Sequence, residues 1–173
     1  ITYNGEIYNH RDVRKEIGDR AGKWCSNSDT ETFLKAHALW RAGCLTRMRG
    51  MFAVAIWDPR EQVIWCARDR LGIKPLYFFS NTSLLIFASE VRALLASDNV
   101  PKKLDSLGLR GFVRFGSLPE PLTLIDGVQS LPAGHWMKVR AGSIIATQCY
   151  WKPNPGSGAA TGSNSVERLR EEL

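Results

Sequence analysis

The side chains that can act as nucleophiles or metal ligands are few in this sequence and widely spaced. Its four cysteines form no Cys-x-x-Cys pair, so a structural zinc site is not expected. They are Cys25, Cys44, Cys66 and Cys149, and none of them begins the chain. In a cytoplasmic protein we expect them to be reduced and mostly buried. The histidines show no metal-ligand spacing and no nucleophile partner, which favours packing or surface roles for His10, His37 and His135.

Three polar stretches could take part in chemistry but also have ordinary structural interpretations. Asn4-Gly5 is a strong turn signal. Ser28-Asp29-Thr30-Glu31 has the form of a helix capping box, in which either Asp29 or Ser28 could cap the helix that follows. Arg68-Asp69-Arg70 is interpreted as a structural ion-pair loop at a strand end, because a buried charge must be paired. The sequence contains no glycine-rich phosphate-binding loop.

The spacing of apolar residues predicts helices and antiparallel strands around these stretches. A helix capped by Asn9 is expected to end at Gly18, and a second is expected to run from the capping box towards Gly43. The inward side chains of the second helix are predicted to be Phe33, Leu34, Ala36, Leu39 and Trp40. Shorter helices are expected over 90–95 and 104–115. The predicted strands are 1–3, 23–25, 51–57, 62–67, 75–79, 84–88, 135–139 and 143–150. This order predicts an α+β domain.

The two ends of the sequence differ from its middle. The chain opens within a β-prone run and has no initiator Met, so we interpret the N-terminus as truncated or partly missing. Residues 153–164 are rich in Gly, Ser, Pro and Ala and are typical of a flexible linker. Ser165 can cap a new helix, so 165–173 is expected to start a following domain. Residues 1–152 are therefore interpreted as one domain.

Composition narrows the class of protein. The 173 residues include 44% hydrophobic and 23% charged residues, as in an ordinary globular domain. No run approaches the roughly 18 apolar residues that cross a bilayer, and no signal peptide is recognisable, so no membrane association and a cytoplasmic location are expected. The net charge of +6 comes from scattered Lys and Arg residues without a nucleic-acid-binding signature, so nucleic acid is not expected as a partner.

Five stretches, in this order, match the motifs of one family: 3–9, 28–31, 50–58, 67–77 and 87–90. Together they resemble the glutaminase domain of the class II, N-terminal-nucleophile glutamine amidotransferases, of the asparagine synthetase B type. The resemblance runs from Ile1 to about Trp151. Each motif alone is weak, but five in the family's order make a specific match. The Asn-Gly-Glu-Ile-Tyr-Asn and Phe-Ala-Ser-Glu forms favour the asparagine synthetase branch over related amidotransferases.

The resemblance implies a mechanism and a set of site residues. The family's nucleophile is an N-terminal cysteine whose own α-amino group is the general base, and it attacks the side-chain amide of glutamine. By resemblance, the Asn4 side-chain amide and the Gly5 backbone N–H form the oxyanion hole. Asp29 binds the substrate α-ammonium, and Glu6 lies near the substrate. The nucleophilic cysteine and the arginine that binds the glutamine carboxylate would lie upstream of Ile1, outside this chain.

The resemblance also implies the fold and the function of the whole protein. The fold would be the four-layer αββα sandwich of the N-terminal-nucleophile hydrolase type. The function would be ATP-dependent amidation of aspartate, with ammonia that this domain releases from glutamine. No cofactor is expected here, while ATP and Mg are expected in a C-terminal synthetase domain of the same chain; a homodimer stays open. Two alternatives remain: an enzyme of the same branch with another carboxylate acceptor, and a non-catalytic pseudo-glutaminase that regulates or binds.

Overall fold

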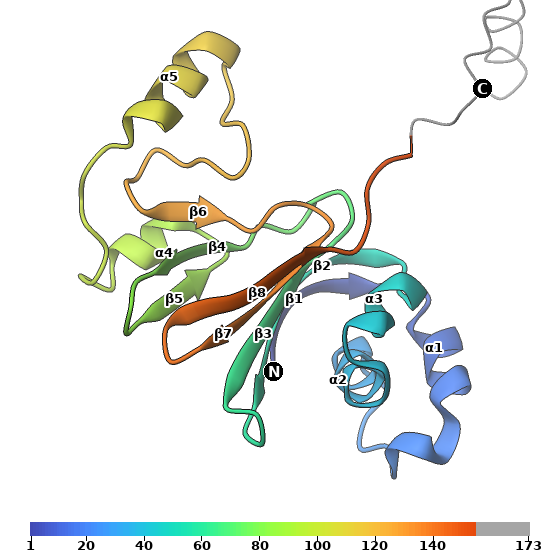
Figure 1. Cartoon of the computed structure of the whole chain (residues 1–173). Coiled ribbons are helices and arrows are strands. Elements are labelled where there is room, and N and C mark those ends of the chain that lie inside the picture. Colours follow the sequence, from blue (N-terminus) through green and yellow to red (C-terminus); the bar gives the residue numbers. More distant parts are fainter. Residues whose placement is uncertain (155–173) are drawn as a thin grey trace, which may run out of the picture.

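The computed structural model describes residues 1–154 (Figure 1). Apart from residues 153 and 154, the predicted linker 153–164 and the predicted domain start 165–173 lie outside the described residues. The helices are α1 (His10–Ile17), α2 (Asp29–Trp40), α3 (Cys44–Arg47), α4 (Val91–Leu95) and α5 (Ser106–Phe115). The strands are β1 (Thr2–Ile7), β2 (Gly50–Asp58), β3 (Val63–Arg68), β4 (Tyr77–Ser80), β5 (Leu85–Ala88), β6 (Val128–Ser130), β7 (His135–Arg140) and β8 (Ser143–Cys149).

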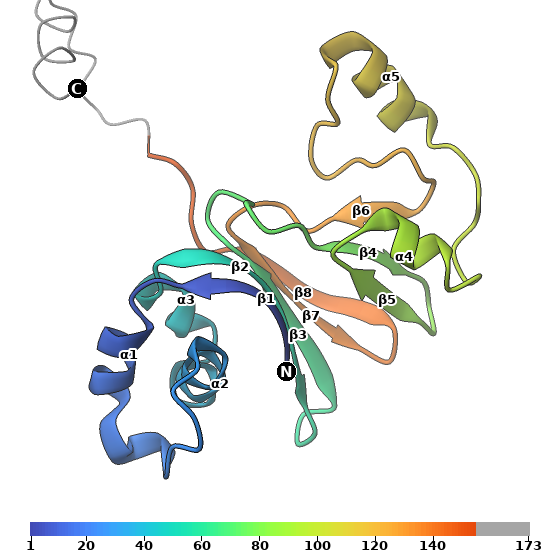
Figure 2. The ribbon, with the colours of Figure 1, turned by 180° about the vertical axis from the view of Figure 1, so that it is seen from behind.

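The strands form two antiparallel sheets with helices outside them (Figures 1 and 2). The first sheet has five strands in the order β1-β2-β3-β7-β8, and the second has three in the order β5-β4-β6. Helices α1, α2 and α3 cover the outer face of the first sheet, and α4 packs on the outer face of the second. The predicted α+β fold with four αββα layers is confirmed.

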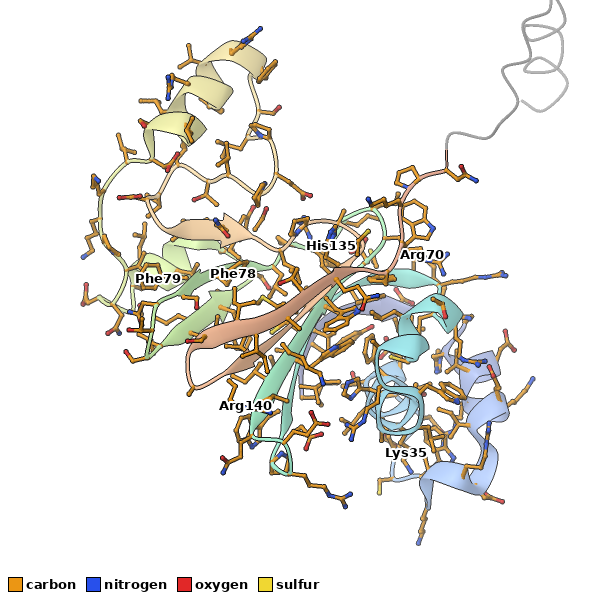
Figure 3. All side chains as sticks on the ribbon, viewed as in Figure 1. Lys35, Arg70, Phe78, Phe79, His135 and Arg140 are labelled. Carbon is orange, nitrogen blue, oxygen red and sulfur yellow. The ribbon has the colours of Figure 1, made fainter. Side chains whose placement is uncertain are left out.

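Alternation of side chains along the strands divides the core between these layers. In β2, Phe52 and Val54 face the helices of the first layer, whereas Ala53 and Ala55 face the second sheet. In β4, Phe78 packs between the sheets and Phe79 packs beneath α4 (labelled in Figure 3). Strands buried on both faces read as continuous apolar runs, as β2 and β3 do. The face of β1 that a residue occupies therefore decides which layer it meets.

The prediction of a turn at Asn4-Gly5 is wrong. Both residues lie inside β1, where Gly5 pairs with Phe52 of β2. Gly5 has φ of +155°, and a Cβ there would overlap the carbonyl oxygen of Met51. Gly50 shows the reciprocal relation, since a Cβ there would overlap the carbonyl oxygen of Glu6. The two glycines therefore permit a close approach of β1 and β2, and no turn is needed to explain them.

Four further expectations are corrected by the structure. No strand forms over 23–25, and β6 was not predicted. In α2, Leu34 is 38% exposed, while the polar residues Thr32 and His37 are buried in its place. Asn9 precedes α1 without a capping hydrogen bond from its side chain, which instead bridges the backbone of Arg47 and Arg49. Asn9 therefore fastens α1 to the entry of β2.

The loop at Arg68-Asp69-Arg70 is structural, but its charges are satisfied differently from the prediction. The buried Asp69 carboxylate accepts hydrogen bonds from four backbone N–H groups, those of Phe52, Leu71, Ile73 and Lys74. Arg68 is paired with Glu120 at 2.5 Å and donates to three backbone carbonyls. The two neighbours are thus not each other's partners. Together they fix the connection between the first and the second sheet.

The buried His37 predicts a pH dependence of stability. It is 6% exposed and stacks on Trp65, with 4.4 Å between ring centroids. Burial, and then the charge of Arg41, lower the pKa of His37 from 6.5 to about 4. Between these two values the unfolded chain binds a proton that the folded chain does not. The free energy of unfolding should therefore fall as the pH falls through this window, by roughly 2–3 kcal/mol.

Urea unfolding of the 173-residue chain at pH 7.5 and at pH 4.5 measures this loss. The His37→Phe variant keeps an aromatic ring against Trp65 but cannot titrate. We expect this variant to lose less stability than the unmodified chain between the two pH values. An equal loss in both proteins would show that another group causes the pH dependence.

Candidate functional site

β1 is an edge strand of the first sheet, and its outer edge carries backbone groups that face away from β2. The Ile7 N–H donates to the Asp29 carboxylate, on the side away from β2. The neighbouring Tyr8 N–H points the other way and donates to the Arg49 carbonyl, just before β2. Because backbone groups alternate in direction along an antiparallel strand, the Gly5 N–H faces the same outer edge as that of Ile7. This outer edge of β1 is the candidate site.

Asp29 reaches this edge from the first turn of α2. Ser28 is the N-cap and accepts from the Glu31 N–H at 3.1 Å, so the capping alternative that assigned this role to Asp29 is wrong. The capping box is half formed, because the Glu31 carboxylate binds the N–H groups of Cys25 and Ser26 and not that of Ser28. Asp29 is thereby left to point at β1. The rigid start of α2 is the platform that positions it.

Two donors from β1 hold the Asp29 carboxylate in place. Its Oδ2 atom accepts from the Tyr3 hydroxyl at 2.7 Å and from the Ile7 N–H at 3.0 Å. Burial opposes the charged form, but these hydrogen bonds outweigh it and keep the pKa of Asp29 below its ordinary value. Burial, and then the hydrogen bond to Asp29, raise the pKa of Tyr3. A fixed, ionised carboxylate therefore stands at the edge. Both hydrogen bonds are accepted by Oδ2, so neither of them occupies Oδ1.

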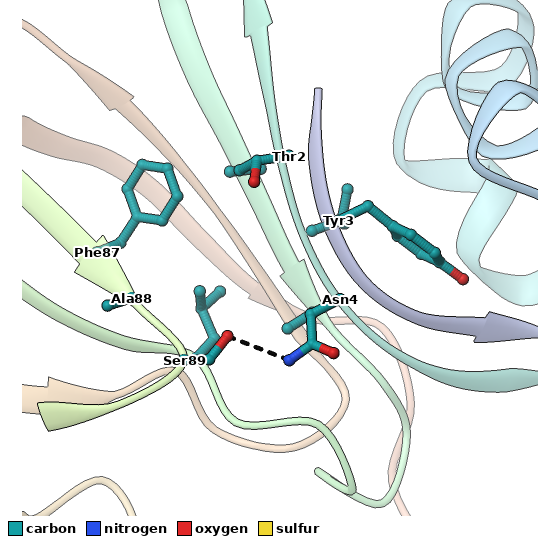
Figure 4. A pocket seen from close by; sticks show the side chains of 10 residues that line it. Thr2, Tyr3, Asn4, Phe87, Ala88 and Ser89 are labelled. Carbon is teal, nitrogen blue, oxygen red and sulfur yellow. Dashed lines mark hydrogen bonds between the residues drawn. The ribbon is translucent and has the colours of Figure 1, made fainter. Parts of the chain in front are cut away.

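The side chain of Asn4 lies on the face of β1 opposite to that of Tyr3, and it lines a cavity of about 390 Å³ between the two sheets (Figure 4). Its side-chain Nδ2 donates to the Ser89 hydroxyl, which follows β5, at 3.1 Å. An amide nitrogen has two N–H donors, so one remains for a ligand. Glu6 follows Asn4 by two residues, so its exposed side chain lies on the same face of β1. The side chains of Asn4 and Glu6 thus both lie on the face of β1 that is turned away from Asp29.

The arrangement brings together the donors and the acceptor that an amino-acid substrate would need. The Gly5 N–H and the Asn4 amide are neighbours in the chain, and the Asp29 carboxylate stands two residues further along the edge, at Ile7. Two residues of a strand span roughly 6.6 Å. Such a spacing suits an extended molecule with a cation at one end and a carbonyl oxygen at the other. Donors next to a reacting carbonyl can stabilise the oxyanion that forms there.

Two side chains of this site had no role in the prediction from sequence. Tyr3 was included in a predicted strand and in the first motif, 3–9, but was given no role, although its hydroxyl makes the shorter of the two hydrogen bonds to Asp29. Ser89 belongs to the Phe-Ala-Ser-Glu motif that carried the resemblance, so the motif itself was the available signal. Both residues contact a predicted site residue directly. They are the positioning residues of the candidate site.

The thiols do not form a nucleophilic centre beside these donors. Cys44 and Cys66 are fully buried, and burial raises the pKa of each to about 12. Cys25 is exposed, and the half-buried Cys149 contacts the carbonyl of Trp151. None of the four lines the cavity beside Asn4. In the described part of the chain, therefore, no cysteine is both activated and adjacent to the candidate oxyanion donors.

The described residues contain neither a metal-binding cluster nor a helix that could span a membrane. No group of three or more His, Cys, Asp or Glu residues within 1–154 is arranged to hold a metal ion. Among the helices that the structure describes, none combines the length and the apolar character needed to cross a membrane.

Comparison with known proteins gives one family and a consistent set of relatives. The glutamine amidotransferase domain matches residues 1–151. Glutamine-hydrolyzing asparagine synthetase 3 of Bacillus subtilis (strain 168) is 35% identical over 136 residues, which are 78% of this chain and 22% of that protein. Asparagine synthetase 1 of the same organism is 34% identical over 154 residues, 89% of this chain and 24% of the relative. The chain thus spans about a quarter of the length of these relatives.

Solved structures share the fold at low sequence identity. Glutamine phosphoribosylpyrophosphate amidotransferase from B. subtilis, complexed with ADP and GMP, has a TM-score of 0.59 and 15% identity. The match covers 88% of this chain and 29% of that one. A second structure, described as the allosteric regulatory enzyme of purine biosynthesis, has a TM-score of 0.58 and 15% identity, and the match covers 87% of this chain and 28% of that one.

Proposed function

Because the chain belongs to the glutamine amidotransferase domain family, we propose that this domain hydrolyses glutamine to glutamate and ammonia within a longer protein. In this proposal the longer protein makes asparagine, as the names of the relatives at 34–35% identity suggest, by amidating aspartate with ATP as the resemblance implies. The match over residues 1–151 and these relatives confirm the resemblance predicted from the sequence. The observation that carries the proposal is the outer edge of β1, where the Asp29 carboxylate is bound at Ile7, two residues along the strand from Gly5.

Each site residue has one task in this proposal. The Asp29 carboxylate binds the α-ammonium group of glutamine, and Tyr3 and the Ile7 N–H hold that carboxylate in place. The side-chain carbonyl of glutamine then lies at the Gly5 N–H and the Asn4 amide. When a thiolate attacks that carbonyl carbon, the oxygen becomes negative and both donors stabilise it. Ammonia leaves, a thioester forms, and water hydrolyses the thioester to glutamate. Glu6 adjoins Gly5 and is proposed as a neighbour of the substrate.

The nucleophile in this proposal is a cysteine outside these 173 residues, on a segment that precedes Ile1. Its own α-amino group, with an ordinary pKa near 7.7–8.0, takes the thiol proton. Two edge strands, β1 and β5, flank the cavity beside Asn4, and such edges can pair with a further extended segment. A preceding segment that entered this cavity would bring its first residue next to the two oxyanion donors. ATP and Mg belong to the following domain.

A direct test compares the full-length protein with the 173-residue chain. The full-length protein should release ammonia from glutamine, and the 173-residue chain should release none above a blank. The reason is that the buried thiols of Cys44 and Cys66 are held protonated and that none of the four cysteines lines the cavity beside Asn4. Ammonia release by the short chain would mean that one of its own cysteines is the nucleophile.

The same experiment separates the alternatives. A full-length protein that binds glutamine but releases no ammonia, and that lacks a cysteine after its initiator Met, would be a non-catalytic pseudo-glutaminase. Ammonia release without asparagine formation from aspartate and ATP would indicate another carboxylate acceptor. Acceptor chemistry is proposed to belong to the following domain, so the acceptor is identified with the full-length protein.

A further inference from the structure

Helix α5 lies apart from the four layers (Figures 1 and 2). Asp105 caps it, and Gly116 ends it in the left-handed conformation. Its glycines face the loop of residues 117–125: a Cβ at Gly108 would overlap the carbonyl oxygen of Thr123, and one at Gly111 would come within 3.0 Å of Pro119. This loop therefore carries α5 on its glycine side. The remaining sides of the helix are open to solvent.

The open sides of α5 are mostly apolar. Val113 is 78% exposed, Phe115 is 63% exposed and Leu107 is 56% exposed. Further large apolar residues on or next to the helix are also exposed, namely Leu104, Leu109 and Phe112. Six such residues close together on one surface feature are uncommon in a domain that has no partner there. We call this set the α5 surface.

A cavity of about 350 Å³, lined mostly by apolar side chains but also by the ion pair of Arg68 with Glu120, lies beneath the loop that carries α5. Leu118, Leu122 and Leu124 of the loop line one wall, and Val91 and Leu95 of α4 line another. A cavity of this size can accept large side chains from a partner. Arg110 and Arg114 lie beside the α5 surface and make no ion pair with any other described residue. A partner surface that is complementary to the α5 surface would therefore be apolar, with acidic residues at its rim.

The position of the chain's exit indicates what covers this surface. After β8, residues 150–154 leave the first sheet towards the same upper end of the molecule as α5, with the exit on the flank of the first sheet and α5 on the flank of the second (Figures 1 and 2). The relatives are about four times as long as this chain, which covers 22–24% of them. A domain that continues from residue 154 therefore starts at the end where the α5 surface stands.

We propose that the α5 surface, together with the cavity beneath its loop, is the docking site for the domain that follows in the same polypeptide. The proposal rests on the proposed function for the presence of that domain. Docking there would be favourable because it would bury apolar side chains that are otherwise in water. It would also hold the following domain beside the second sheet.

Site-specific photo-crosslinking in the full-length protein tests this inference. A benzophenone amino acid replaces Val113, and a matched control replaces Ile145, which is 49% exposed on β8. The probe at 113 should crosslink within one chain to peptides beyond residue 173, whereas the control should not. Crosslinks between two copies, crosslinks confined to residues 1–154, or no crosslinks would each overturn the proposal. The readout is a mass, so it does not depend on glutaminase activity.

A second measurement does not use the probe. The double variant Val113→Asp with Phe115→Asp should undock the following domain and speed proteolysis of residues 153–164 several-fold. Ile145→Asp is the control and should leave the cleavage rate unchanged. Both α5 positions are exposed, so circular dichroism should show a folded domain in the double variant. Unchanged cleavage in a folded double variant would contradict docking at α5.

Discussion

Asn4→Ala in the full-length protein is expected to lower the glutamine-dependent kcat by about 10²–10³-fold, with little change in KM. Asn4 adjoins Gly5 in β1, and its side-chain amide is proposed to donate to a substrate oxygen that becomes negative only as the thiolate attacks. Loss of one such donor typically costs roughly 3–4 kcal/mol in the transition state. An interaction made only in the transition state affects kcat and leaves substrate binding almost unchanged. Steady-state kinetics with glutamine measure both constants.

Two controls separate this role from a structural one. Ammonia-dependent synthesis bypasses the site, so it should be unchanged in Asn4→Ala. The Asn4 side chain is exposed and lies within β1, so its removal should not disturb the pairing with β2. Asn4→Asp should be at least as damaging to kcat, because a carboxylate repels an oxyanion. Normal glutamine turnover in a folded Asn4→Ala protein would remove Asn4 from the oxyanion hole.

Asp29→Asn is expected to raise the KM for glutamine by about 30-fold or more. The carboxylate is proposed to pair with the substrate α-ammonium, and loss of one partner of a close charge pair costs about 2 kcal/mol or more. The amide oxygen of Asn can still accept from Tyr3 and Ile7, which both bind one oxygen of Asp29. The variant therefore removes the charge and keeps the connection between α2 and β1. Initial rates over a range of glutamine concentrations measure the effect.

Tyr3→Phe is the matched control for Asp29→Asn. It removes one hydrogen bond to Asp29 but leaves the negative charge in place, so it should raise KM less than Asp29→Asn does. Ammonia-dependent synthesis should be unchanged in both variants. If Asp29→Asn lowered glutamine-dependent and ammonia-dependent synthesis equally, Asp29 would be only a structural link between α2 and β1.

Much of the fold follows from the pattern of apolar residues. The runs 51–57 and 62–67 predict β2 and β3 closely, because strands buried on both faces need continuous apolar sequence. Gly18 marks the end of α1, because glycine adopts the positive φ found there. The three-residue strand β6 could not be predicted in this way. It exists through its pairing with β4, and a local pattern carries no signal of that pairing.

The site was harder to predict from local rules. Asn4-Gly5 resembles a turn, yet the close approach of β1 and β2 is what requires Gly5. Asp29 resembles a helix cap, yet Ser28 takes that role and releases Asp29 towards β1. In both places the tertiary contact overrides the local preference. The motif resemblance identified these residues. The contacts of Tyr3 with Asp29 and of Ser89 with Asn4 join segments that are far apart in the sequence, so only the structure shows them.

A crystal structure of the full-length protein with glutamine bound, and with its nucleophilic cysteine replaced by alanine, tests the proposed site most directly. The account predicts the α-nitrogen of glutamine within hydrogen-bond distance of Asp29 Oδ1. It predicts the side-chain oxygen of glutamine between the Gly5 N–H and Asn4 Nδ2. Glutamine bound away from the outer edge of β1, or bound there with its side-chain oxygen turned away from both donors, would contradict it.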